Sequence, residues 1–234
     1  MVDFSIRNLL KRKDKKEILI VLLFAFFWNL FAYNFPRLFT GSWHHYDMTM
    51  PVDELFPFMP WTVSIYFGCY LFWYANYYIV SLHDKQHRDQ FFCADMIAKL
   101  ICMIIFVAIP TTNVRPKIVD NDLWSFLMRF LHIVDDPDNL FPSIHCLVSW
   151  LCWIGIRKRK DVSLLYRWFS LALALAICIV TLTTRQHVIV DVISGVALAE
   201  ICYFLAGIPK IRVIYTCLIE FLVRLFTLPK NKNK

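Results

Sequence analysis

The chain is poor in charge and in glycine, and each shortage restricts what it can be. Only 18% of its 234 residues are Asp, Glu, Lys or Arg, whereas 59% are hydrophobic. Soluble domains are closer to half apolar and a quarter charged, so this composition excludes a disordered chain, a coiled coil and most soluble enzymes. The five glycines form no glycine-rich phosphate loop, which argues against a nucleotide-binding fold. The composition favours a single domain embedded in a membrane.

Long apolar runs dominate the sequence, and six of them approach the roughly 20 helical residues that cross a bilayer core of about 30 Å. They are Ile18–Phe35, Trp61–Val80, Met96–Pro110, Ile144–Ile156, Leu164–Thr184 and His187–Gly207. The fourth is short, and we expect it to include residues 140–143 as well. A further stretch, Val213–Leu228, is amphipathic and is typical of a helix that lies at the membrane interface.

This pattern predicts an all-α integral membrane protein with six transmembrane helices in one bundle. A basic N-terminal segment (1–17) precedes the membrane domain (18–207), and an amphipathic, basic segment (208–234) follows it. The first apolar run is not expected to be a signal peptide, because no small-residue cleavage site follows it. Eight cysteines are too few for a disulfide scaffold, and most of them lie within apolar runs.

The net charge of +7 is explained by topology, because the basic residues gather at the ends of apolar segments. In a six-span topology, 20 of the 25 Lys and Arg fall on the side of the N-terminus, and the other five are Arg37, Arg115, Lys117, Arg129 and Arg185. Positive charge collects on the cytoplasmic side. We therefore predict that both termini are cytoplasmic and that no nucleic acid is bound. Residues 111–143 and the starts of the fourth and sixth spans then share the extracytoplasmic side.

His187 and Asp191 are four residues apart at the start of the sixth span, so they lie on one face of a helix. An ionisable residue within a membrane segment is costly unless it is paired. A carboxylate that accepts from one ring nitrogen leaves the other nitrogen free to act as a nucleophile. The alternative is a structural polar pair that joins helices.

Ser143 and His145 lie at another predicted helix start, in Phe141-Pro142-Ser143-Ile144-His145. Pro followed by Ser is typical of a helix N-terminus, where unpaired backbone N–H groups bind anions. A histidine at that point can protonate a leaving oxygen. The alternative is a capped helix with an incidental histidine. Arg115, just after the third span, suits a phosphate, although an arginine there is also typical of a membrane anchor.

Together these segments resemble the three signatures of the type 2 phosphatidic acid phosphatase superfamily: K-x6-R-P, P-S-G-H and S-R-x5-H-x3-D, in that order. They correspond to Arg115-Pro116, Pro142-Ser143-Ile144-His145 and His187-x3-Asp191. The sequence Asp191-Val192-Ile193-Ser194-Gly195 is also similar to the family's D-V-I-x-G. The resemblance extends from about Ile109 to Ala199.

The resemblance implies that His187 attacks phosphorus to form a phosphohistidine and that Asp191 orients it. It implies that His145 protonates the departing alkoxide and then activates water, while Arg115 and Ser143 hold the phosphoryl oxygens. No metal or other cofactor is needed in this scheme. The implied substrate is a lipid phosphate or polyprenyl phosphate among membrane lipids, hydrolysed on the extracytoplasmic side of the plasma membrane.

Three positions depart from the family pattern. Ala108 stands where a lysine is expected, Ile144 where a glycine is expected, and Thr181 where an arginine is expected. Arg185 is a candidate for supplying the missing positive charge. The Thr-Arg-Gln-His run is similar to the branch that contains inositol phosphorylceramide synthase-like proteins. These departures leave two alternatives open: a headgroup phosphotransferase and a non-catalytic membrane transporter.

Two other clusters are expected to be structural. Asp135-Asp136-Pro137-Asp138 is interpreted as a solvated acidic turn, because its spacing matches no calcium-binding loop. The aromatic run from Tyr70 to Tyr78 is expected to form an interfacial belt and to pack between helices.

Overall fold

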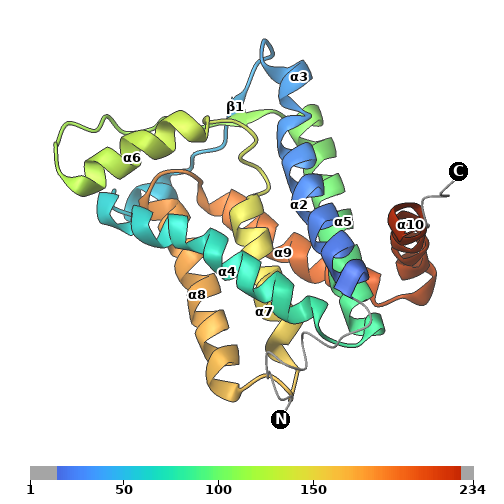
Figure 1. Cartoon of the computed structure of the whole chain (residues 1–234). Helices are drawn as coiled ribbons and strands as arrows, with labels where there is room; N and C mark the ends of the chain where they lie inside the picture. The colour runs from blue at the N-terminus through green and yellow to red at the C-terminus, as the bar shows by residue number, and fades with distance from the viewer. Residues whose placement is uncertain (1–14, 228–234) are drawn as a thin grey trace, which may run out of the picture.

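A computed structural model describes residues 15–227, which form a mostly helical bundle (Figure 1). The helices are α2 (Lys15–Asn34), α3 (Arg37–Thr40), α4 (Val63–Ser81), α5 (Lys85–Ala108), α6 (Leu123–Val134), α7 (Ile144–Arg157), α8 (Leu164–Thr183), α9 (Ile189–Ala206) and α10 (Pro209–Thr227). Two 3-10 turns, Pro51–Leu55 and Pro60–Thr62, precede α4. The short strands β1 (Tyr46–Asp47) and β2 (Thr111–Thr112) pair in parallel, so the chain is not purely helical. Most of the predicted N-terminal segment and Leu228 lie outside the described residues.

Four described helical segments are long and apolar enough to cross a membrane, which indicates an integral membrane protein. They are Lys15–Thr40, Lys85–Ala108, Leu164–Thr183 and Ile189–Ala206. Helices α2, α4, α8 and α9 begin and end within three residues of the predicted spans. The second and fourth predicted spans correspond to α4 and α7, which are outside this set of four. The six-span topology and the cytoplasmic termini therefore stay predictions.

Helix α7 is the centre of the bundle. It packs against α4, α5, α8 and α9, and ten of its 14 residues are buried. A helix that is apolar around its whole circumference is typically buried in this way. Residues 140–143 are not helical, so the expected extension of this span was wrong. Pro142 lacks an N–H donor, and the Ser143 hydroxyl caps the helix by accepting from the Cys146 N–H at 3.3 Å.

Helix α5 begins at Lys85, eleven residues before the predicted Met96. Its first half carries several charged residues, and Arg88 and Asp95 among them are buried with partners. Arg88 donates to Glu17 of α2, and the carboxylate of Asp95 accepts from Lys99 at 2.9 Å. The charged residues end the apolar run in the sequence, but the helix continues through them. The apolar run alone therefore placed the start of the helix too late.

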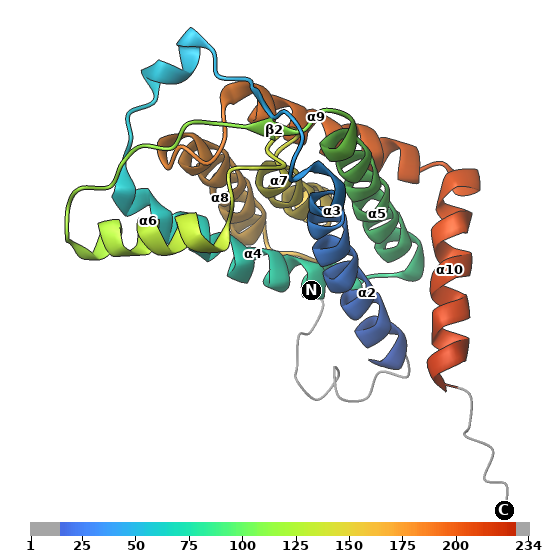
Figure 2. The same ribbon diagram turned by 90° about the horizontal axis from the view of Figure 1, so that it is seen from above.

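The two ends of the bundle are formed by different segments of the chain (Figures 1 and 2). In Figure 1 the end of α5 and the starts of α7 and α9 lie in the upper half of the molecule, and the α4–α5 and α7–α8 connections lie in the lower half. Helix α10 packs on α2 and α5, and it is seen nearly end-on in Figure 1 and lengthwise in Figure 2. The polar segments singled out in the sequence thus meet at one end.

Gly195 allows α9 to approach the start of α7 closely. A Cβ atom at this position would lie 2.5 Å from the Ser143 carbonyl oxygen and 3.3 Å from the Leu147 nitrogen. Both neighbours are backbone atoms, which cannot move aside as a flexible side chain does. The glycine of the Asp191-Val192-Ile193-Ser194-Gly195 run therefore has a packing role between the two helices.

We expect Gly195→Ala to destabilise the protein, because overpacking of this kind costs about 1–3 kcal/mol. The measurement is thermal unfolding of the detergent-solubilised protein. Gly68→Ala in α4 is the matched control, since a Cβ there has no neighbour within 4 Å. The control is expected to keep or raise stability, because alanine favours a helix by about 1 kcal/mol over glycine. Equal unfolding temperatures for the two variants would contradict this packing role.

Candidate active site

Two histidines from separate segments lie side by side at the upper end of the bundle. The ring centroids of His145, in the first turn of α7, and His187, just before α9, are 5.8 Å apart. Nε2 of His145 is buried and has no hydrogen-bond partner among the described residues. Segments 42 residues apart in the chain therefore supply a pair of imidazoles facing one small region.

His187 is held by Asp191, as its position in the sequence suggested. Its Nδ1 lies 3.3 Å from Oδ2 of Asp191, and the same oxygen accepts from the Val188 N–H at 3.0 Å. The Asp191 carboxylate therefore fixes the orientation of the His187 ring. Because Nδ1 is engaged, Nε2 is the nitrogen available for attack.

A backbone hydrogen bond connects the two histidine-bearing segments. The Ser143 N–H donates to the Asp191 carbonyl at 3.1 Å. The Ser143 side chain is fully buried and its hydroxyl caps α7. Ser143 is thus placed at the junction of α7 and α9, two residues from His145.

Arg115 reaches the same region from the loop after β2. Its Nη2 donates to Oε1 of Gln186 at 2.7 Å, and its Nη1 donates to the carbonyl of Asp135. The loop is anchored nearby, since the Asn113 side-chain amide donates to the Arg185 carbonyl at 2.9 Å. The guanidinium therefore lies between the segment before His187 and the segment before α7.

Arg185 has a different environment. Its Nη1 donates to the carbonyl of Asp53 at 3.1 Å, and its backbone adopts a φ of 54° in the turn between α8 and α9. The Asp53 carboxylate accepts from the Ile189 N–H at 2.7 Å, which caps the start of α9. Arg185 thus contacts this capping loop through its side chain, and its role as a phosphate-binding residue stays a prediction.

Asp135 contradicts the interpretation of its segment as a solvated acidic turn. Its two carboxylate oxygens accept from the hydroxyls of Tyr33 in α2 and Tyr66 in α4. Burial raises the pKa of Asp135, but the charge of His145 and the two tyrosine hydrogen bonds together lower it below its usual value. The sequence did not reveal this role, because the partners of Asp135 lie 69 residues or more away in the chain.

Tyr66 links Asp135 to His145. Its hydroxyl lies 3.0 Å from Oδ2 of Asp135 and 3.3 Å from Nδ1 of His145, and its ring contacts the imidazole with centroids 4.6 Å apart. When the hydroxyl donates to the carboxylate, its oxygen can accept the Nδ1 proton of His145. This arrangement directs the Nε2 nitrogen of His145 away from Tyr66.

A small cavity lies between these groups. It is lined by Tyr33, Asp135, Asp138, Asn139, Leu140, Ile144, His145, Gln186 and His187. Each histidine is connected to a carboxylate, His187 directly and His145 through a phenol. A nucleophilic nitrogen beside a proton donor, with a guanidinium nearby, is suited to covalent transfer of a phosphoryl group.

Comparison with known proteins is consistent with this geometry. The model of the PAP2 superfamily matches residues 43–205, which include Arg115, His145, His187 and Asp191. No curated protein and no solved structure matches the chain. The family model extends from the loop before α4 to the last turn of α9 and covers well over half of the chain. The chain belongs to the PAP2 superfamily.

Proposed function

We propose that the protein is a membrane phosphatase that hydrolyses a lipid or isoprenoid phosphate through a phosphohistidine on His187. Members of the PAP2 superfamily are typically metal-independent phosphatases, so membership suggests a membrane phosphatase or phosphotransferase. The observation that carries the proposal is the pair of adjacent imidazoles, one anchored by Asp191 and the other with a free Nε2. The predicted topology puts this site on the extracytoplasmic side.

In the first step, the lone pair on Nε2 of His187 attacks phosphorus, and the bond from phosphorus to the alkyl oxygen breaks. The leaving oxygen takes the proton from Nε2 of His145, so the lipid departs as a neutral alcohol. Asp191 balances the positive charge that forms on the His187 ring. Arg115 stabilises the charge on the phosphoryl oxygens, which is largest in the transition state.

In the second step, water attacks the phosphohistidine and gives its proton to His145, which is now neutral. The bond from phosphorus to nitrogen breaks, and inorganic phosphate leaves. Both histidines return to their starting protonation states. His145 thus donates a proton in the first step and accepts one in the second, and both transfers take place at Nε2.

The charge around the cavity favours a second candidate, transfer of a phosphorylated headgroup to an alcohol. Ala108 and Thr181 remove two expected positive charges, and Asp135 adds a negative one. A phosphodiester carries one negative charge, whereas a monoester carries nearly two at neutral pH. A site with little positive charge is better matched to the diester, as in an inositol phosphorylceramide synthase-like reaction. An assay with a labelled phospholipid and an added alcohol separates the two reactions.

We expect His187→Ala to abolish release of phosphate from lipid phosphates, because it removes the attacking nitrogen. His145→Ala is expected to slow release by about 10²–10⁴-fold, the usual contribution of a general acid. The measurement is phosphate release by purified protein from phosphatidate, a prenyl pyrophosphate and a sphingoid phosphate. His44→Ala, at an exposed loop residue, is the control and should match the wild type. Unchanged turnover by His187→Ala would contradict the mechanism.

We expect Tyr66→Phe to lower kcat with little change in KM, because the ring keeps its packing while His145 loses its connection to Asp135. The loss should be large, about 10–100-fold, for an alkyl phosphate, whose leaving oxygen needs a proton. It should be small for p-nitrophenyl phosphate, which leaves without one. The measurement is steady-state turnover of both substrates.

Tyr78→Phe is the matched control for this prediction, since Tyr78 is an exposed tyrosine on the same helix. It should leave the turnover of both substrates unchanged. An equal loss with both substrates in Tyr66→Phe would mean that the hydroxyl has only a structural role.

A further inference from the structure

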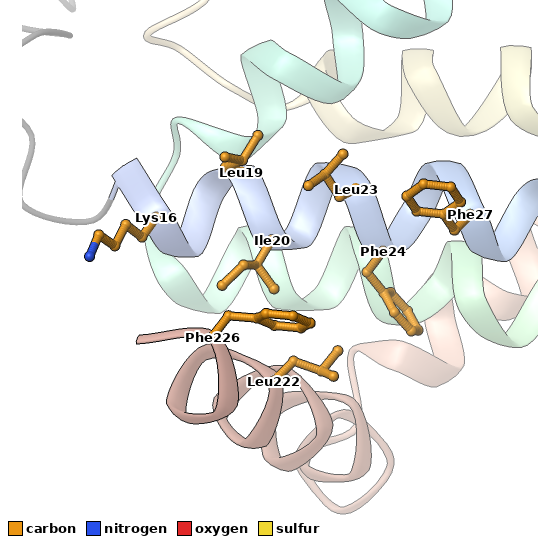
Figure 3. Close-up of a pocket in the computed structure, with 8 residues that line it drawn as sticks. All are labelled: Lys16, Leu19, Ile20, Leu23, Phe24, Phe27, Leu222 and Phe226. Atoms are coloured by element: carbon orange, nitrogen blue, oxygen red, sulfur yellow. The ribbon is translucent and has the colours of Figure 1, made fainter. Parts of the chain in front are cut away.

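Two apolar grooves follow α2 and share one residue of it, Leu23. The α2–α10 groove is lined by Ile20 and Phe24 of α2 and by Leu222 and Phe226 of α10, which point toward one another, with Lys16 at one end (Figure 3). The α2–α4 groove is lined on one side by α2 and on the other by aromatic residues of α4. Their volumes are similar, about 460 Å³ and about 420 Å³. Size therefore does not distinguish them, but their neighbours do.

The α2–α4 groove adjoins the catalytic cavity. Trp73 and Tyr70 line the groove, and their ring centroids lie 5.4 Å and 6.3 Å from that of His145. On the other wall, Leu30 lines the groove three residues before Tyr33, which lines the cavity. Both walls thus continue from the cavity into the groove.

The opposite end of the groove is marked by a buried charged pair. Lys99 lines the groove, and its ammonium lies 2.9 Å from the carboxylate of Asp95, which also accepts from the Tyr77 hydroxyl at 2.6 Å. From Tyr70 to Tyr77 the groove follows α4 for about 10 Å, at 1.5 Å per residue. An apolar chain gains nothing by displacing a buried ion pair from its partners. The apolar lining of the groove therefore ends at the Lys99–Asp95 pair.

We propose that the α2–α4 groove binds the hydrocarbon chain of the phosphate substrate and that the Lys99–Asp95 pair limits the chain length it accepts. This proposal rests on the proposed function of the site. A phosphate at the two histidines would have its ester oxygen beside His145, and the attached chain would pass Trp73 and Tyr70 into the groove. The α2–α10 groove lies toward the start of α2, at the end away from Tyr33, and does not take part.

The test compares butyl phosphate with hexadecyl phosphate in detergent micelles. Ala25→Phe fills the α2–α4 groove at a buried residue of α2. It should raise KM for hexadecyl phosphate by about tenfold or more, because a large part of the chain loses its apolar contacts. It should leave kcat/KM for butyl phosphate within about twofold. Ile20→Phe, the same kind of change in the α2–α10 groove, should affect neither substrate.

Loss of butyl phosphate turnover in Ala25→Phe would indicate that this variant does not fold. A second variant then tests the groove. Leu30→Trp, at a partly exposed groove residue, should then give the same chain-length dependence. The double variant Lys99→Met, Asp95→Asn should move the preference toward longer chains. Equal effects on short and long substrates would overturn the groove proposal. Full turnover by His187→Ala would instead overturn the proposed function on which it rests.

Discussion

The hydrogen bond from the Ser143 N–H to the Asp191 carbonyl holds the site together. His145 follows Ser143 by two residues and His187 precedes Asp191 by four, so this one contact sets the separation of the two imidazoles. It forms only where α7 and α9 approach closely, and Gly195 permits that approach because a Cβ there would meet the Ser143 carbonyl. The burial of α7 on all sides then keeps its first turn, and His145 with it, in one position.

The second constraint is electrostatic. Asp191 and Asp135 each stabilise positive charge on one histidine, and both effects are stronger in a buried site than in water. The two connections differ in kind: Asp191 touches His187 directly, whereas Asp135 acts on His145 through the hydroxyl of Tyr66. A direct contact suits a nucleophile that becomes fully charged, and an indirect one suits an acid that must release its proton. In the proposed mechanism Arg115 supplies positive charge for the phosphoryl oxygens, so the charge of the substrate matters.

Much of this arrangement was accessible from the sequence, and the exceptions have physical reasons. Apolar runs and membrane depth predicted most of the long helices and the grouping of His145, His187 and Asp191, because each signal lies within a short stretch of sequence. Asp135 was misjudged, because its tyrosine partners come from α2 and α4 and no local pattern announces them. The start of α5 was missed because Arg88 and Asp95 find buried partners that only the folded bundle supplies. Arg185 was a candidate by its position near His187, and the structure adds a hydrogen bond from its side chain to the Asp53 carbonyl that the sequence did not reveal.

The central claim is that His187 becomes covalently phosphorylated during turnover. The most direct measurement is a rapid alkaline quench of the enzyme with phosphate-labelled substrate, followed by mapping of the labelled peptide, since the bond from phosphorus to nitrogen survives alkali. The account predicts label on His187 that forms within the first turnover and disappears when the substrate is exhausted. Label on another residue, or turnover with no labelled intermediate at the earliest times, would contradict it.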